Sequence, residues 1–168
     1  MSNILSAWEV YDDMIGALSW LEQEDIGDGE DVIHPNFKGL WILIVTLLRA
    51  IGHVLDKVDK KRDSTLEKII DDKYQEWKAD KDKNSIYWDF ICEERNSILK
   101  EYEIGIVFRY ENDGWEVYYK DDYKNNALDY IHVAECWWRQ QLKEIENIYD
   151  SEKSKSRELS HHRSSPEE

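Results

Sequence analysis

Apolar residues recur every three or four positions over most of the chain. Segments 4–23, 37–60, 64–77, 86–102 and 126–149 all show this spacing, which places apolar side chains along one face of an α-helix. The segment 64–77 is the shortest of them. The sequence therefore predicts a mainly α protein, a four-to-five-helix up-and-down bundle.

The spacing changes between residues 104 and 120. Ile104–Tyr110 and Trp115–Tyr119 are rich in β-branched and aromatic residues, and Asn112-Asp113-Gly114 lies between them. Two such runs around an Asp-Gly step are typical of a β-hairpin. We expect a small hairpin at about 104–120, inserted before the last helix, and a loop at Asp25–Asn36.

Composition favours one folded domain with a polar end. The chain has 168 residues, 41% of them hydrophobic, including eight Trp and ten Tyr. This is enough to bury a core, so residues 1–150 are predicted to form a single helical-bundle domain. Residues 151–168 are mostly serine and charged residues and are predicted to be a disordered polar tail.

The segment 37–60 is apolar on nearly all sides. Its uninterrupted apolar run, Leu40–Leu48, is about half the roughly 20 residues that a membrane span needs, and Arg49 and His53 follow. We therefore expect a core helix and no membrane insertion. No signal peptide is apparent, and the cysteines match no disulfide or metal spacing, which favours a cytoplasmic protein. The second apolar side of this helix favours a homodimer.

Three predicted helices each carry one charged residue on the inward stripe. A helical wheel places Asp12, Arg95 and Glu135 among apolar neighbours of their helices. If they lie at the same depth, they form a buried carboxylate–arginine–carboxylate cluster. Such a cluster either fixes the helix register or holds the arginine for phosphate or partner recognition. In the structural case, Arg95→Ala should destabilise the fold by roughly 3–5 kcal/mol.

The net charge limits the choice of partner. The chain has 37 acidic and 22 basic residues, a formal charge of −15. Binding along a nucleic-acid backbone needs clustered Lys and Arg, so RNA is not favoured as a partner, although a local basic cleft remains compatible with the composition. Exposed Trp and Tyr on an acidic surface favour a protein partner.

The order of elements, the segment Glu94-Arg95-Asn96 and the closing helix with Trp137, Trp138 and Leu142 resemble HEPN-type helical domains. The resemblance spans roughly Ile4 to Tyr149. Such domains occur in toxin–antitoxin and phage-defence systems. The resemblance implies that active members cleave RNA without metal, usually across a dimer interface. They use an arginine, often followed by asparagine, and a histidine separated from the arginine by four to six residues.

This sequence departs from that pattern at the histidine. Arg95 and Asn96 match, but Lys100, Glu101 and Tyr102 occupy the histidine positions. Cleavage of RNA needs a base that takes a proton near neutral pH, for which His is suited and an ordinary Lys or Tyr is not. The resemblance therefore implies a degenerate site, unless Arg95 and Asn96 act with Lys100 or Tyr102.

A second basic pair lies on another predicted helix. Arg49 and His53 are four residues apart and so share one helix face, one residue short of the family spacing. His132 and Cys136 also share a face, but two ligands do not close a zinc site. No phosphate-binding glycine loop or paired-carboxylate motif is present, so neither a metal nor a cofactor is predicted.

Three functions are compatible with these features. The favoured one is a non-catalytic interaction or regulatory component on a HEPN-like scaffold, within a defence or toxin–antitoxin system. The second is a metal-independent endoribonuclease that uses Arg95 and Asn96. The third is an acidic immunity or antitoxin protein that masks a basic partner, whose binding should weaken steeply with salt.

Overall fold

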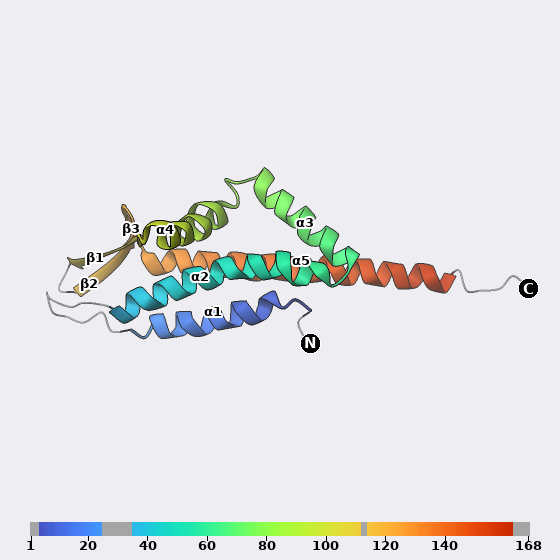
Figure 1. Cartoon of the computed structure of the whole chain (residues 1–168), viewed down its shortest axis with the longest axis horizontal. Coiled ribbons are helices and arrows are strands. Elements are labelled where there is room, and N and C mark those ends of the chain that lie inside the picture. The colour runs from blue at the N-terminus through green and yellow to red at the C-terminus, as the bar shows by residue number, and fades with distance from the viewer. Residues whose placement is uncertain (1–3, 25–34, 112–113, 163–168) are drawn as a thin grey trace, which may run out of the picture.

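The structure is a computed structural model that describes residues 4–24, 35–111 and 114–162 (Figure 1). The mainly α prediction is confirmed. The helices are α1 (Ala7–Leu21), α2 (Pro35–Lys57), the 3₁₀ turn η1 (Asp59–Lys61), α3 (Ser64–Ala79), the π-helix η2 (Ile86–Cys92), α4 (Glu93–Glu101) and α5 (Ala127–His162). The strands are β1 (Ile106–Glu111), β2 (Gly114–Tyr119) and β3 (Asp122–Asn126). The expected loop at 25–36 lies mostly outside the described residues.

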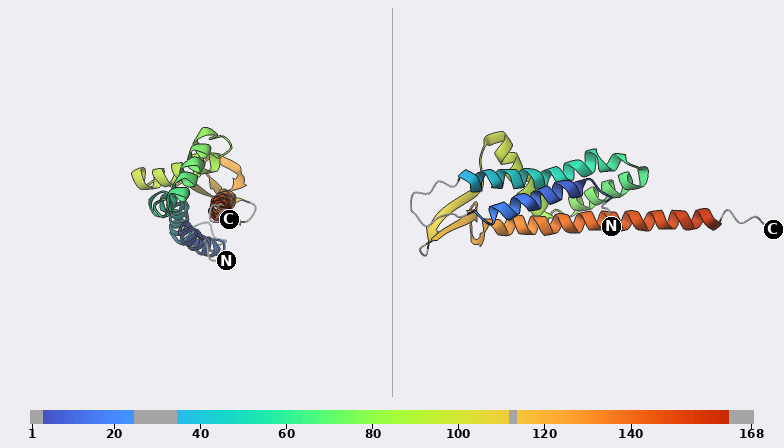
Figure 2. Two further views of the ribbon diagram at one scale, coloured as in Figure 1. Left: turned by 90° about the vertical axis from the view of Figure 1, so that its right-hand side faces the viewer. Right: turned by 90° about the horizontal axis from the view of Figure 1, so that it is seen from below.

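Three long helices run side by side along the molecule. α1 packs antiparallel to α2, and α5 lies beside both, whereas α3, η2 and α4 cover the remaining side (Figures 1 and 2). The core lies between these elements and is built around large buried side chains of four of them, among which are Met14, Trp41, Leu48, Phe90, Ile131 and Trp138. Trp41 and Trp138 are fully buried, so these large aromatic side chains contribute to the core.

The sheet stands at one end of the helices and has one strand more than predicted. β1 and β2 form the expected hairpin, in the register Ile106↔Tyr119 to Glu111↔Gly114. Residues 112 and 113 of the predicted turn lie outside the described residues. β3 then pairs with β2 in the order β1-β2-β3. Its sequence, Asp-Tyr-Lys-Asn-Asn, is polar, so hydrophobic alternation could not predict it.

α5 is much longer than the sequence predicts. It extends through His162 (Figure 1). The sequence predicts a disordered tail from residue 151, and this prediction is wrong for residues 151–162. Lys155 pairs with Glu152 at 2.9 Å, and the Ser154 hydroxyl donates to the carbonyl of Asp150. Charged residues with good helix propensity and such local pairs extend a helix that is already nucleated by packing. Residues 163–168 lie outside the described part.

The start of α1 is fixed by two acidic side chains from distant segments. Asp59 of η1 is fully buried and accepts hydrogen bonds from the backbone N–H groups of Ser6 (2.8 Å) and Ala7 (3.0 Å). Glu146 of α5 accepts one from Ile4 at 2.7 Å. These carboxylates satisfy N–H groups that a helix start leaves unpaired, which ties α1 to η1 and α5.

One region, Asn36–Lys61, is long and apolar enough to cross a membrane by length and composition. A third of its most apolar window, 33%, is buried inside the protein. Its buried side chains, Trp41, Ile44, Val45, Leu48, Ile51 and Leu55, face the other helices. This arrangement is compatible with the core helix that the sequence predicts, and Leu43 at 45% exposure lies on the outer side.

Candidate functional site

A π-helix immediately before α4 determines where the candidate site residues point. η2 spans Ile86–Cys92 and places Tyr87, Phe90 and Ile91 in the core. On a wheel drawn at 100° per residue, the buried residues Tyr87, Ile91, Glu94 and Ile98 share one face, and Arg95 lies at the edge of that face. Glu94 takes the inward position that the sequence predicts for Arg95, which is half-buried instead. π-helices occur frequently at functional sites.

Glu94 is fully buried between α2, α4 and the sheet. Its Oε1 accepts hydrogen bonds from Trp41 Nε1 (3.0 Å) and from the backbone N–H of Gly105 (2.7 Å). Burial and the neighbouring Glu94 carboxylate raise the pKa of the Tyr119 hydroxyl well above its usual value. Glu94 therefore fixes α4 against α2 and the sheet. Sequence reasoning missed it because the apolar but exposed residues Leu99 and Tyr102 displaced the predicted inward face toward Arg95.

The predicted cluster of Asp12, Arg95 and Glu135 does not form. Asp12 is exposed on α1, because Tyr11, Met14 and Leu18 form the buried stripe of that helix. Glu135 accepts a hydrogen bond from the Tyr11 hydroxyl and lies 3.3 Å from Arg139 Nε. Burial and Glu135 together raise the pKa of Tyr11. Glu135 thus joins α1 to α5, away from Arg95, and the cluster prediction is wrong.

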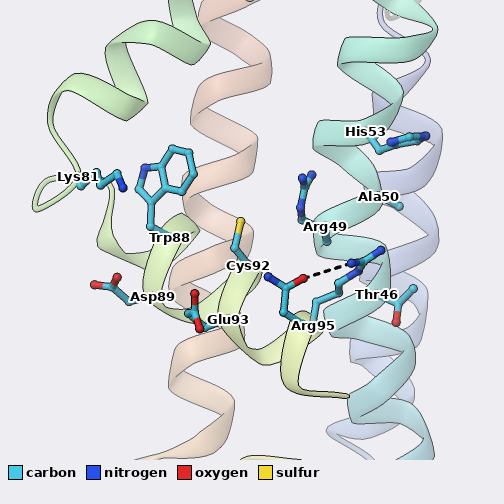
Figure 3. A pocket seen from close by; sticks show the side chains of 11 residues that line it. Thr46, Arg49, Ala50, His53, Lys81, Trp88, Asp89, Cys92, Glu93 and Arg95 are labelled. Atoms are coloured by element: carbon cyan, nitrogen blue, oxygen red, sulfur yellow. Dashed lines mark hydrogen bonds between the residues drawn. The ribbon is translucent and has the colours of Figure 1, made fainter. Parts of the chain in front are cut away.

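Arg95 instead lines an open cleft of about 610 Å³ between α2 and the η2–α4 segment (Figure 3). We call it the arginine cleft. Its lining brings together both basic pairs that the sequence singles out, Arg49 with His53 and Arg95 with Asn96. The full lining is Thr46, Arg49, Ala50, His53, Lys81, Trp88, Asp89, Cys92, Glu93, Arg95 and Asn96.

The two arginines of the cleft have weak partners. Arg95 Nη1 donates to Asn96 Oδ1 at 3.2 Å, and the Arg49 guanidinium lies 5.9 Å from the centre of the Tyr87 ring. Among the residues that the structure describes, neither arginine forms an ion pair with a carboxylate. Asp89 and Glu93 also line the cleft but stand on the side remote from α2 (Figure 3). The α2 side of the cleft is therefore locally basic.

The opposite wall carries an aromatic ring and a thiol. Trp88 is held by a hydrogen bond from its Nε1 to the carbonyl of Trp77 at 2.9 Å, and Lys81 Nζ lies 5.0 Å from the centre of its ring. Burial raises the pKa of the Cys92 thiol, against the opposing effect of Arg49. The Cys92 thiol is thus protonated and uncharged at neutral pH where it lines the cleft.

His53 lies one turn beyond Arg49 on α2 and is exposed. Although it lines the cleft, its ring is directed away from Arg95 (Figure 3). A general base must reach the proton that it takes. With the His53 ring in this orientation, His53 and Arg95 do not both reach the same reacting atom.

The other two predicted site residues lie outside the cleft. Lys100 is exposed on α4, and Tyr102, at 69% exposure, ends that helix with a left-handed φ of 54°. Lys38 lies 5.1 Å from the centre of the Tyr102 ring. The structure therefore brings neither Lys100 nor Tyr102 to Arg95.

His132 and Cys136 do not converge on a common point. His132 Nε2 lies 3.1 Å from Glu22 Oε1, whereas Cys136 Sγ accepts from Arg139 at 3.3 Å. Within the described ranges no group of three or more His, Cys, Asp or Glu side chains is arranged to hold a metal ion.

Sequence reasoning missed the remaining cleft residues because they belong to no motif. Trp88 of η2 and Lys81 of the turn before it lie together on one wall of the cleft. Comparisons with protein-family models, with curated proteins and with solved structures find no match for this chain.

Proposed function

We propose that the protein is a non-catalytic, HEPN-like binding component whose arginine cleft recognises a phosphate-bearing ligand. The observation that carries the proposal is the position of Arg49 and Arg95 in one open cleft without a carboxylate partner among the described residues. Two guanidinium groups in one cleft repel each other, and an anion bound between them offsets this repulsion. Their planar donors match the oxygens of a phosphate group.

Arg49 and Arg95 differ in this from three other arginines of the chain. Arg62, Arg109 and Arg139 each pair with a carboxylate, namely Asp59, Glu111 and Glu135. Among the described residues, Arg49 and Arg95 form no such ion pair, although the chain has 37 acidic and 22 basic residues. Asn96 and Thr46 add polar groups to the same cleft.

Among the residues that the structure describes, none is placed as a base beside Arg95, which supports a binding role over a catalytic one. Lys100 and Tyr102, at the histidine positions of the family pattern, lie outside the cleft, and the His53 ring is directed away from Arg95. The resemblance implies a role in a defence or toxin–antitoxin system, in the cytoplasm, with a protein partner or a second copy of the chain. The half-exposed apolar side of α2, which includes Leu43, would suit such a contact.

The proposal is tested by titrating the protein with inorganic pyrophosphate in a calorimeter. Wild type should bind, and Arg49→Gln with Arg95→Gln should abolish the binding heat without changing the circular dichroism spectrum. The matched control is Arg109→Gln, an exposed arginine of β1 that lies over the Tyr123 ring at 3.7 Å. Equal binding by wild type and the double variant would refute the proposal.

A metal-independent endoribonuclease is the second candidate, because His53, Arg95 and Asn96 line the same cleft. A rotation about the His53 side chain would turn its ring toward the arginines. Incubation of the protein with mixed cellular RNA in excess EDTA separates the two functions. Cleavage that disappears in both Arg95→Ala and His53→Ala would establish the nuclease; intact RNA in all samples would favour binding alone. The acidic-inhibitor function rests on net charge and stays a prediction.

A further inference from the structure

Two large apolar side chains are exposed on α4, next to the arginine cleft. Leu99 is 57% exposed and lies one helical turn beyond Arg95, on the same side of α4. Tyr102 ends the helix and is 69% exposed. We call Leu99 and Tyr102 the apolar strip. Exposed apolar side chains that gather beside a cleft, rather than standing singly, are typical of an interaction surface.

α2 runs alongside both the apolar strip and the cleft. Lys38 Nζ lies 5.1 Å from the centre of the Tyr102 ring, and Thr46, eight residues further along α2, lines the cleft with Arg95. The two helices are therefore antiparallel here, with the strip beside the first turn of α2 and the arginines further along. Eight residues of α-helix rise about 12 Å. A ligand that covers the strip and the arginines is therefore longer than a phosphate group.

The spacing of these side chains matches an extended peptide. Arg95 and Leu99 are separated by about 6 Å along the axis of α4, at roughly 1.5 Å per residue. In an extended chain, alternate side chains point to the same side and lie about 6–7 Å apart. A peptide side chain bound at Arg95 therefore brings the side chain two residues away over Leu99.

We infer that the arginine cleft and the apolar strip together bind an extended segment of a partner protein that carries a phosphorylated serine or threonine. The phosphate lies at Arg49 and Arg95, and a large aliphatic side chain two residues away covers Leu99. This inference rests on the proposed function, because it places the phosphate at the same arginines. A phosphorylated side chain has a charge of about −1.5 to −2 at neutral pH and oxygens that pair with guanidinium donors.

The surroundings of the arginines favour a phosphopeptide over an RNA strand. A strand carries a phosphate at every nucleotide, so its next phosphates would lie over the apolar strip or over the surface of a chain with net charge −15. A phosphopeptide brings one phosphate to the cleft, and its neighbouring residues can be apolar. At physiological salt the attraction of the arginines fades over about 8 Å, so it does not compensate for the repulsion of further phosphates.

The test measures peptide binding by calorimetry at about 150 mM salt. The probe is Gly-Leu-Ala-phosphoserine-Ala-Leu-Gly, whose leucines stand two residues before and after the phosphoserine and so serve either chain direction. It should bind about tenfold more tightly than the same phosphopeptide with glycine in place of both leucines, since burial of a leucine side chain adds to the phosphate contacts. It should also bind more tightly than its unphosphorylated form and than a single-stranded RNA oligomer.

Variants assign the effect to the apolar strip. Leu99→Ser should weaken binding of the leucine phosphopeptide about tenfold and leave pyrophosphate binding unchanged, whereas Arg95→Gln should weaken both. Val133→Ser is the matched control, because Val133 is an aliphatic residue of α5 with a similar exposure of 55%. Thermal unfolding of each variant verifies that it is folded.

The outcomes separate this inference from the proposed function. Equal affinity for the leucine and glycine phosphopeptides would overturn the role of the apolar strip and leave phosphate recognition intact. Tighter binding of the RNA oligomer than of the leucine phosphopeptide would overturn the choice of a peptide. A dimer in light scattering that Leu99→Ser converts to a monomer would show that a second copy of the chain covers the strip instead. Failure of pyrophosphate and of both phosphopeptides to bind would refute both proposals together.

Discussion

The Glu94 carboxylate accepts a 2.7 Å hydrogen bond from the backbone N–H of Gly105 and so joins α4 to the start of the sheet. The same oxygen accepts from Trp41 on α2. Because successive helix residues point in directions about 100° apart, an inward Glu94 turns Arg95 sideways, toward the cleft. The buried carboxylate thus determines the direction of the arginine that follows it.

Gly105→Ala should destabilise the protein. A Cβ at this position would lie 2.6 Å from Tyr119 Cε2 and 2.7 Å from Glu94 Oε2, both of which are held in the core. We expect the free energy of unfolding to fall by about 1–3 kcal/mol, measured by urea denaturation. Gly16→Ala is the control, since nothing lies within 4 Å of its Cβ, and alanine should stabilise helix α1 slightly. A Gly105→Ala variant as stable as wild type would contradict the close approach.

Tyr102→Gly should stabilise the protein although it removes a large side chain. Tyr102 adopts a φ of 54° at the end of α4, a conformation that disfavours residues with a Cβ. Relief of this strain should raise the free energy of unfolding by about 1 kcal/mol, less the loss of the contact with Lys38. Lys100→Gly, within α4, should lower it by about 1 kcal/mol instead. A change in the free energy of unfolding in the same direction for both variants would contradict strain at Tyr102.

Asp63 should make stability depend on pH. Its side chain caps α3 by accepting from the Leu66 N–H at 2.9 Å, and it also accepts a hydrogen bond from the Tyr149 hydroxyl. Tyr149 first, then Leu66 and Lys153, lower the pKa of this carboxyl below its ordinary value of 3.8. Because the folded state holds the lower pKa, Asp63 stabilises the fold above that ordinary value, and the contribution is lost as pH falls through the folded pKa.

Asp63→Ala should therefore lose about 1 kcal/mol of stability at neutral pH, the usual value of a helix cap. The difference from wild type should narrow as the pH is lowered from about 4 toward 2, in urea denaturation at each pH. Asp12→Ala, which removes an exposed carboxylate, should change stability little at any of these values. A difference that is constant with pH would show that Asp63 acts without its charge.

Periodicity predicts elements that bury one face and fails where the backbone departs from ideal geometry. Regular spacing predicts the helix α2 but not its buried face. The expected stripe is Leu40, Leu43, Leu47, Ile51, Val54 and Val58, whereas the structure buries Trp41, Ile44, Leu48, Ile51 and Leu55. At η2 periodicity predicts a helix but not the π turns, which no spacing of apolar residues encodes. It fails also at β3, which is held by backbone pairing to β2 and by the hydrogen bond from the Tyr130 hydroxyl to Asp122.

The candidate site illustrates the same limit. Sequence reasoning identifies Arg49, His53, Arg95 and Asn96 separately, by spacing and resemblance. It does not bring the two pairs together, since their approach depends on how η2 packs against α2. The prediction of a buried Arg95 is wrong because it counts Leu99 and Tyr102 as inward, whereas both are exposed, at 57% and 69%. The buried face is centred on Glu94 instead.

Arg95→Ala should leave the fold intact, contrary to the destabilisation of roughly 3–5 kcal/mol that a buried ion cluster implies. Arg95 is half-buried, and it donates a hydrogen bond to the neighbouring Asn96 at 3.2 Å. The substitution leaves no buried carboxylate unpaired, so the free energy of unfolding should change by less than about 1 kcal/mol.

Tyr11→Phe provides the comparison for this last variant. It removes the hydroxyl that donates to the largely buried Glu135, and should cost about 1–3 kcal/mol, more than Arg95→Ala. Thermal and urea unfolding of the two variants measure this order directly. If Arg95→Ala is less stable than Tyr11→Phe, the arginine stabilises the fold. If it is stable and fails to bind pyrophosphate, the side chain is retained for the ligand, because neither packing nor ion pairing then explains a guanidinium at this position.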